Sequence, residues 1–109
     1  MADSEPRMTI ATQLVLRALL EDPQQELYGL QIGQAAGLPS GTVHPILARL
    51  EGLRWLESFW EDIDPRDEGR PARRYYRLTA AGADSARAAL VRASVRNRGF
   101  VTRPLGGEA

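Results

Sequence analysis

Apolar residues recur at three- and four-residue spacings early in the chain, and this is the spacing of one face of a helix. The first run covers residues 9–20, with Thr9 as N-cap and an end at Asp22-Pro23, because proline disfavours helical geometry in the residue before it. A second run covers residues 27–36, where two glycines cost about 1 kcal/mol each, so that this helix depends on packing. The pattern predicts two helices before Gly37.

A third helix is predicted only a few residues later. Ser40 is a good N-cap, apolar residues recur as far as Leu50, and Gly52 is expected to end the helix in a left-handed conformation. Pro45 follows the cap by five residues, close enough to the first turn that we expect only a local distortion.

Two short runs rich in aromatic residues come next, at residues 55–61 and 75–78, and they predict an antiparallel hairpin. Residues 62–74 between them contain two prolines and Gly69, and we expect a long, exposed and mobile loop. Thr79 then caps a last helix that runs to about Arg96 with a narrow, alanine-rich stripe.

The predicted fold is mainly α with a small antiparallel β-ribbon. Its order of elements is that of a winged helix-turn-helix domain over residues 9–78, followed by an additional C-terminal helix over residues 79–96. Residues 1–8 and 97–109 are expected to be flexible ends. In winged helix-turn-helix domains the third helix enters the major groove and the loop of the ribbon reaches phosphates or the minor groove, so the layout favours DNA binding.

The composition excludes several classes of function. A chain of 109 residues with 43% apolar and 26% charged residues is typical of one folded domain. The absence of cysteine and the single histidine leave little for a metal site, and no catalytic constellation is present, so we expect neither cofactor nor enzyme. No apolar run approaches the ~20 residues of a membrane span, and the N-terminus is too acidic for a secretory signal, which predicts a cytoplasmic protein without membrane attachment.

Charge is divided unevenly along the chain. Residues 1–68 carry 5 Arg and 12 acidic residues, whereas residues 69–103 carry 9 Arg and one acidic residue. The 14 basic residues are all arginine, which suits bidentate contacts with phosphates or guanine edges, although the base composition of the genome explains this bias equally well. The formal net charge of zero keeps a protein partner open as an alternative to DNA.

Four short segments are uninformative one by one, but their order and spacing along the chain are specific when taken together. They are Tyr28-Gly29-Leu30-Gln31-Ile32, the run from Leu38 to Glu51, the run from Gly69 to Thr79, and Ala81-Gly82. In them the sequence resembles the PadR-like family of transcriptional regulators. The resemblance implies a winged-helix homodimer, in most members a repressor, whose N- and C-terminal helices pair between subunits and whose DNA affinity often responds to a small effector. Residues 79–96 would then form a dimerisation helix. The usual tyrosine of the family before the proline is His44 in this sequence.

Candidate DNA contacts lie first around the third helix. Ser40 and Thr42 can simply start the helix, but a recognition helix also presents its first residues to bases and phosphates. His44 has no second histidine nearby, so a phosphate or base contact is favoured over a metal. Arg49 is either a DNA contact or a surface ion-pair partner. Tyr28, in the first of the resembling segments, is a further candidate.

The second group of candidates lies on the wing. Gly69 and Pro71 present Arg70, whose charge a narrow minor groove would attract. Arg73 and Arg74 are candidate phosphate contacts, with an ordinary charged strand face as the alternative. The acids of residues 61–68 would repel phosphates unless they point away or pair with these arginines.

Trp55, Phe59 and Trp60 are interpreted as core or interface residues. If an effector pocket exists, we expect it at the junction between subunits, where it would take a flat hydrophobic molecule. The sequence therefore predicts a homodimeric, sequence-specific regulator of transcription that binds a palindromic operator in double-stranded DNA and acts as a repressor. The alternative is a winged-helix protein-interaction module whose acidic N-terminal part and aromatic ribbon bind a partner protein.

Overall fold

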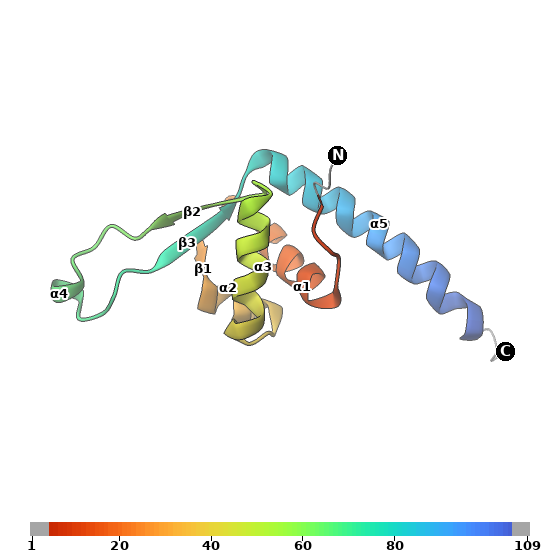
Figure 1. Cartoon of the computed structure of the whole chain (residues 1–109), viewed down its shortest axis with the longest axis horizontal. Helices are drawn as coiled ribbons and strands as arrows, with labels where there is room; N and C mark the ends of the chain where they lie inside the picture. The colour runs from red at the N-terminus through yellow and green to blue at the C-terminus, as the bar shows by residue number, and fades with distance from the viewer. Residues whose placement is uncertain (1–4, 106–109) are drawn as a thin grey trace.

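The computed structural model describes the backbone of residues 5–105 and the side chains of residues 5–96. Within this range the elements, in chain order, are α1 (Ile10–Leu20), β1 (Leu27–Tyr28), α2 (Gly29–Ala36), α3 (Ser40–Gly52), β2 (Leu56–Trp60), α4 (Pro65–Glu68), β3 (Arg74–Leu78) and α5 (Ala80–Leu105). Figure 1 shows α1, α2 and α3 packed together at the centre, with the β2–β3 hairpin projecting to one side and α5 to the other. We call the hairpin with its connecting loop, residues 56–78, the wing.

The three central helices bury one apolar core. Its largest fully buried side chains come from α1, α2 and α3, and they are Val15, Leu16, Ile32, Val43, Leu47 and Leu50. The predicted N-cap of α1 is confirmed, because the Thr9 hydroxyl oxygen accepts the Thr12 N–H at 3.1 Å. None of the helices in the part of the chain described is both long and apolar enough to cross a membrane.

The start of α2 differs from the sequence prediction. Leu27 and Tyr28, predicted as helix, form the short strand β1, which pairs antiparallel with Tyr76 and Tyr75 of β3. The sheet therefore has three strands in the order β1-β3-β2 rather than two. Pairing with the free edge of β3 outweighs the local helical pattern, and α2 begins only at Gly29.

Both predicted ends of α3 are corrected. Ser40 is the first helical residue and Pro39 is the N-cap, since the Pro39 carbonyl accepts the Thr42 and Val43 N–H groups at 3.0 and 3.1 Å. Gly52 lies inside the helix, and the left-handed residue is Arg54, with φ of 66°. The Arg54 N–H donates to the Glu51 backbone carbonyl and the Trp55 N–H donates to the Leu50 backbone carbonyl, which makes this turn a Schellman motif. Trp55, the residue after the turn, is buried in the core. Pro45 does not interrupt the helix.

The predicted hairpin is confirmed, with Leu56 opposite Leu78 and Trp60 opposite Arg74. The loop between the strands is exposed but contains the short helix α4, whose N-terminus is capped because Asp64 accepts the Arg66 N–H at 3.0 Å. Of the aromatic residues interpreted as core or interface, Trp55 is buried, Phe59 is half-buried and Trp60 is exposed.

Both chain ends carry more structure than the sequence suggests. The last helix extends nine residues beyond Arg96, so residues 97–105 are helical, because one interior glycine costs only about 1 kcal/mol and does not end a helix. Near the N-terminus Pro6 is buried and Glu5 pairs with Arg92, so residues 5–8 are packed against the domain. The remaining predicted flexible residues, 1–4 and 106–109, lie outside the described range.

The alanine-rich stripe of α5 allows a close approach to the rest of the domain. Ala83, Ala86, Ala89 and Ala93 are buried. At the start of the helix a Cβ on Gly82 would lie 2.6 Å from Trp55 Cα, a separation that real Cβ atoms do not reach. Small side chains thus set the distance between α5 and the turn that leads into β2.

Candidate nucleic-acid interface

The outward face of α3 consists of small residues. Val43, Leu47 and Leu50 point into the core. The exposed positions on the other side of the helix, again three and four residues apart, are Gly41, Pro45, Ala48 and Gly52. A helix with so narrow a ridge can bring its backbone close to the floor of a groove.

The polar candidates on α3 flank this ridge. Ser40, His44 and Arg49 are exposed, and Thr42 is half-buried. The imidazole of His44 lies against the first turn of α2, because a Cβ on Gly29 would lie 2.9 Å from His44 Cε1. The described residues include no group of three or more potential metal ligands. The contact with Gly29 places His44 beside the N-terminus of α2, where an anion would also be stabilised.

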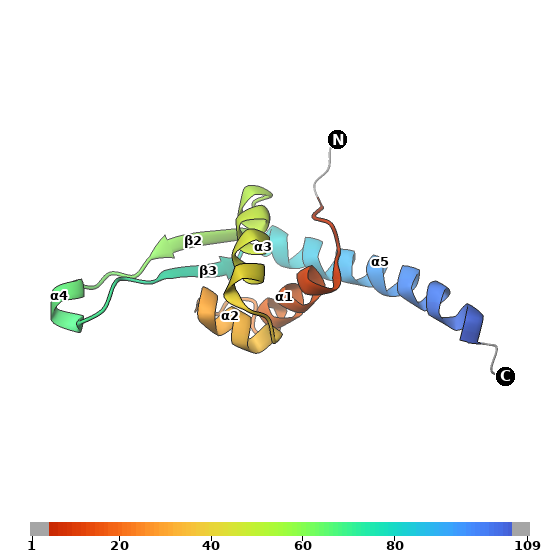
Figure 2. The same ribbon diagram turned by 60° about the horizontal axis from the view of Figure 1, so that its bottom comes forward.

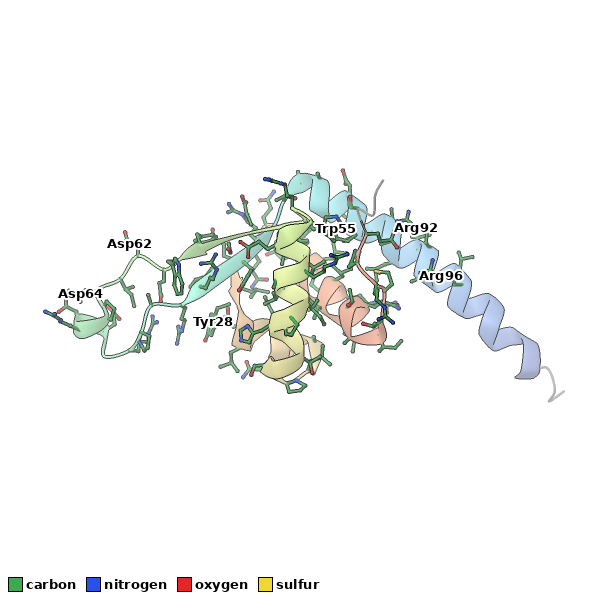
Figure 3. All side chains as sticks on the ribbon, in the orientation of Figure 1. Tyr28, Trp55, Asp62, Asp64, Arg92 and Arg96 are labelled. Carbon is green, nitrogen blue, oxygen red and sulfur yellow. The ribbon has the colours of Figure 1, made fainter. Side chains whose placement is uncertain are left out.

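Tyr28 lies next to this contact and belongs to an aromatic row across the outer face of the sheet. Its ring meets Tyr75 edge-on at 5.4 Å, and Phe59 stacks on Tyr75 at 6.2 Å. The Arg73 guanidinium lies 4.4 Å from the Tyr28 ring centroid, so Tyr28 holds that arginine as well as facing solvent itself. Figure 3 shows Tyr28 at the base of the wing.

Arg74 points to the other side of the ribbon, toward α3. Its guanidinium lies 5.2 Å from the Trp60 ring centroid and 3.6 Å from a carboxylate oxygen of Glu51. At that distance the ion pair is weak, and the side chain is 38% exposed. Arg73 and Arg74 thus remain available for phosphates on the two faces of the ribbon.

Arg70 is paired with an acid at the base of the wing loop, as the sequence left open for the acids of residues 61–68. Its guanidinium donates two hydrogen bonds to Glu61, at 2.7 and 2.9 Å, and Glu61 also accepts the Arg73 backbone N–H at 3.1 Å. This bidentate pair closes the base of the loop that carries α4 and neutralises the charge expected to attract DNA. The remaining acids Asp62, Asp64, Asp67 and Glu68 are exposed, and Figure 3 shows Asp62 and Asp64 far out on the wing.

The family model of the transcriptional regulator PadR-like family matches residues 15–88 of this chain. The chain belongs to the PadR-like family. Members of this family are transcriptional regulators and not enzymes. No curated protein sequence matches the PadR-like chain.

Solved structures share its fold. A PadR family regulator from Eggerthella lenta is 25% identical, with 84% of this chain and 80% of that chain covered and a TM-score of 0.64. Reduced AbfR bound to DNA is 28% identical, with coverages of 76% and 54% and a TM-score of 0.59. The regulator PcaV from Streptomyces coelicolor, in complex with its natural ligand, is 26% identical, with coverages of 89% and 63% and a TM-score of 0.65. The PadR-like chain therefore spans little more than half of AbfR and under two thirds of PcaV.

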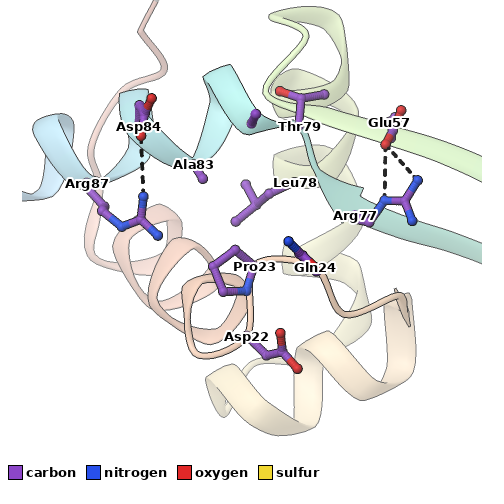
Figure 4. A pocket seen from close by; sticks show the side chains of 11 residues that line it. Asp22, Pro23, Gln24, Glu57, Arg77, Leu78, Thr79, Ala83, Asp84 and Arg87 are labelled. Carbon is purple, nitrogen blue, oxygen red and sulfur yellow. Dashed lines mark hydrogen bonds and ion pairs between the residues drawn. The ribbon is translucent and has the colours of Figure 1, made fainter.

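A groove of about 800 Å³ lies between the wing, α5 and the turn that follows α1 in the PadR-like chain (Figure 4). Its walls carry ion pairs, from Arg77 to Glu57 at 3.0 Å and from Arg87 to Asp84 at 3.4 Å. This groove is polar and lies within a single chain, so it is a different feature from the hydrophobic effector pocket expected between subunits.

Glu61 gives the fold a measurable dependence on pH. The hydrogen bonds from Arg70 lower the pKa of Glu61 from 4.5 to about 2. Burial opposes this shift in pKa, and the Arg73 N–H adds a further, smaller lowering. Since the folded pKa lies below the unfolded one, the pair stabilises the fold fully above about pH 4.5, and this stabilisation is lost as the pH falls toward 2.

We therefore expect the unfolding temperature of the wild type to fall more steeply below pH ~5 than that of the Glu61→Gln variant. Circular dichroism melts of both proteins over the acid range measure this difference. Parallel curves would show that the pair does not form in solution.

Proposed function

We propose that this PadR-like chain binds double-stranded DNA, with α3 in the major groove and the wing against flanking phosphates. The observation that carries the proposal is the outward face of α3, whose small ridge admits close approach while Ser40, Thr42, His44 and Arg49 line its edges. The DNA-bound structure of AbfR, which has the same fold, supports this use of the domain.

The candidate residues divide by their chemistry. Arg49 and His44 are proposed to contact base edges, Ser40 and Thr42 to contact bases or phosphate at the N-terminus of α3, and Tyr28, Arg73 and Arg74 to contact phosphates. Arg70, which the sequence suggested as a minor-groove contact, is proposed to position the wing through Glu61 instead. Phosphate contacts fix the orientation on DNA, and base contacts supply the preference for sequence.

A homodimer on a palindromic operator is part of the proposal. α1 and α5 pack together, and both expose apolar side chains: Ile10 is 66% exposed on α1, and Val91 and Val95 are 63% and 56% exposed on α5. If a second copy of the chain packed against α1 and α5, these apolar side chains would be buried, and their removal from water would stabilise the dimer.

Val91→Glu is expected to convert the dimer to a monomer, because each new charge would be desolvated in the interface at a cost of several kcal/mol. Light scattering after gel filtration gives the molar mass directly. Leu30→Glu is the matched control, since Leu30 on α2 is 57% exposed and lies outside α1 and α5. A monomeric wild type, or equal behaviour of both variants, would contradict this interface.

The proposed regulatory outcome is repression, because a dimer seated on an operator excludes other proteins from the same DNA. A flat hydrophobic effector at the junction between subunits is proposed to change its affinity, and the ligand-bound structure of PcaV supports this extension. A reporter gene behind the operator should be expressed less when the protein is present.

One observation favours a second candidate function. The loop of the wing carries the exposed acids Asp62, Asp64, Asp67 and Glu68, and Trp60 near its base is 62% exposed. Exposed acids beside an exposed aromatic ring suit a basic protein partner. Selection of bound sequences from random duplex DNA separates the two functions. We expect a palindrome whose half-sites are about 10 base pairs apart or a multiple of this, and failure to enrich any sequence would favour the protein-interaction module.

A further inference from the structure

Arg7 lies in a segment that the structure anchors at both ends. Before it Pro6 is buried and Glu5 pairs with Arg92 of α5. After it Met8 packs against the core, and its carbonyl accepts the side-chain amide of Gln13 at 2.9 Å. Arg7 itself is exposed, so its side chain starts from a fixed backbone position and points out of the domain.

This segment and α3 form the two walls of a groove of about 460 Å³. Arg7 lines the first wall, and Pro45, Ile46 and Arg49 line the second. None of the residues lining this groove is acidic, and neither arginine is paired with a carboxylate within the described residues. The guanidinium groups of Arg7 and Arg49 therefore line one groove beside the outward face of α3, and neither is neutralised by a carboxylate within the described residues.

The groove lies on the side of α3 away from the wing. Figures 1 and 2 both show the N-terminal segment on one side of α3 and the wing on the other. The major groove of B-DNA is about 12 Å wide, and a sugar-phosphate strand runs along each edge of it. A duplex that receives α3 and meets the wing along one edge of this groove therefore brings its other strand toward Arg7.

We propose that Arg7 binds the phosphate backbone of the DNA strand opposite the wing, with Arg49 as its neighbour on α3. The inference rests on the proposed function and adds an N-terminal contact that the sequence motifs did not indicate. Because Arg7 lies outside α3, its contact concerns phosphate and not base edges, so it adds affinity without adding sequence preference.

The test uses the full chain, the duplex recovered by selection, and a scrambled duplex of the same length. Dissociation constants from fluorescence anisotropy are measured over a range of salt concentrations. Arg7→Gln is expected to weaken binding to both duplexes by a similar factor, about tenfold for two copies per dimer, and to reduce the magnitude of the salt slope by about 2. Arg7→Lys keeps the charge and should keep most of the slope.

Arg87→Ala is the control, because it also removes one exposed arginine but lies on α5 in the groove of Figure 4. An unchanged slope for Arg7→Gln, while the wild type binds the selected duplex, would overturn the role of Arg7 and leave the proposed function standing. A wild type that binds neither duplex would instead refute the proposed function. Thermal melts of Arg7→Gln should match the wild type, since the side chain is exposed.

Discussion

Gly41→Glu is expected to weaken DNA binding at least about 100-fold while the protein remains folded, because a like charge placed against phosphate costs several kcal/mol. Gly41 is the second residue of α3, is exposed, and has open space where a Cβ would be added. A glutamate in the first turn of a helix interacts favourably with the helix dipole and has a higher helix propensity than glycine. The substitution therefore separates binding from folding.

Gly41→Gln is the matched control, since it has the same size without the charge. We expect a smaller loss of affinity for it, and unfolding temperatures of both variants at or above that of the wild type. Equal and small losses for the two variants in an anisotropy titration would mean that the N-terminus of α3 does not face DNA.

Gly82→Ala is expected to destabilise the fold by about 3 kcal/mol or more, a large share of the ~5–15 kcal/mol that stabilises a typical domain. The added methyl would meet the backbone of Trp55, which cannot rotate away as a side chain can. Either α5 or the turn into β2 must move, and Trp55 and the alanine stripe then lose their packing.

Urea unfolding measures this loss. Gly52→Ala is the control, because nothing lies within 4 Å of a Cβ there, and alanine in a helix is favoured over glycine by up to about 1 kcal/mol. We expect Gly52→Ala to be neutral or stabilising. A Gly82→Ala variant as stable as Gly52→Ala would show that α5 does not pack on this turn as described.

Hydrophobic periodicity is sufficient to predict the existence of α1, α2, α3 and α5, each of which buries a repeating face, whereas the one-turn helix α4 buries no residue and is predicted as loop. Periodicity failed where a distant partner decides the conformation. Leu27 fits the helical pattern, but pairing with Tyr76, 49 positions away, makes it a strand residue. The end of α3 was misplaced because burial of Trp55 requires the left-handed turn at Arg54, a position usually favourable to glycine.

The candidate interface was predicted less completely than the fold. Residue types and motif spacing identified Ser40, Thr42, His44 and Arg49, and the structure leaves Ser40, His44 and Arg49 exposed and Thr42 half-buried. The pairing of Arg70 with Glu61 follows from the geometry at the base of the loop, so charge counting alone could not assign it. Arg7 belongs to no motif, and only the packing of residues 5–8 brings it beside α3.

Backbone amide shifts in NMR spectra of the labelled protein, recorded as the selected duplex is added, test the central claim most directly. The account predicts the largest shifts at residues 40–49 of α3, with smaller ones at Tyr28 and at residues 73–74. Shifts confined to the acidic loop around α4, or no shifts in α3 at ~0.15 M salt where specific complexes persist, would contradict it.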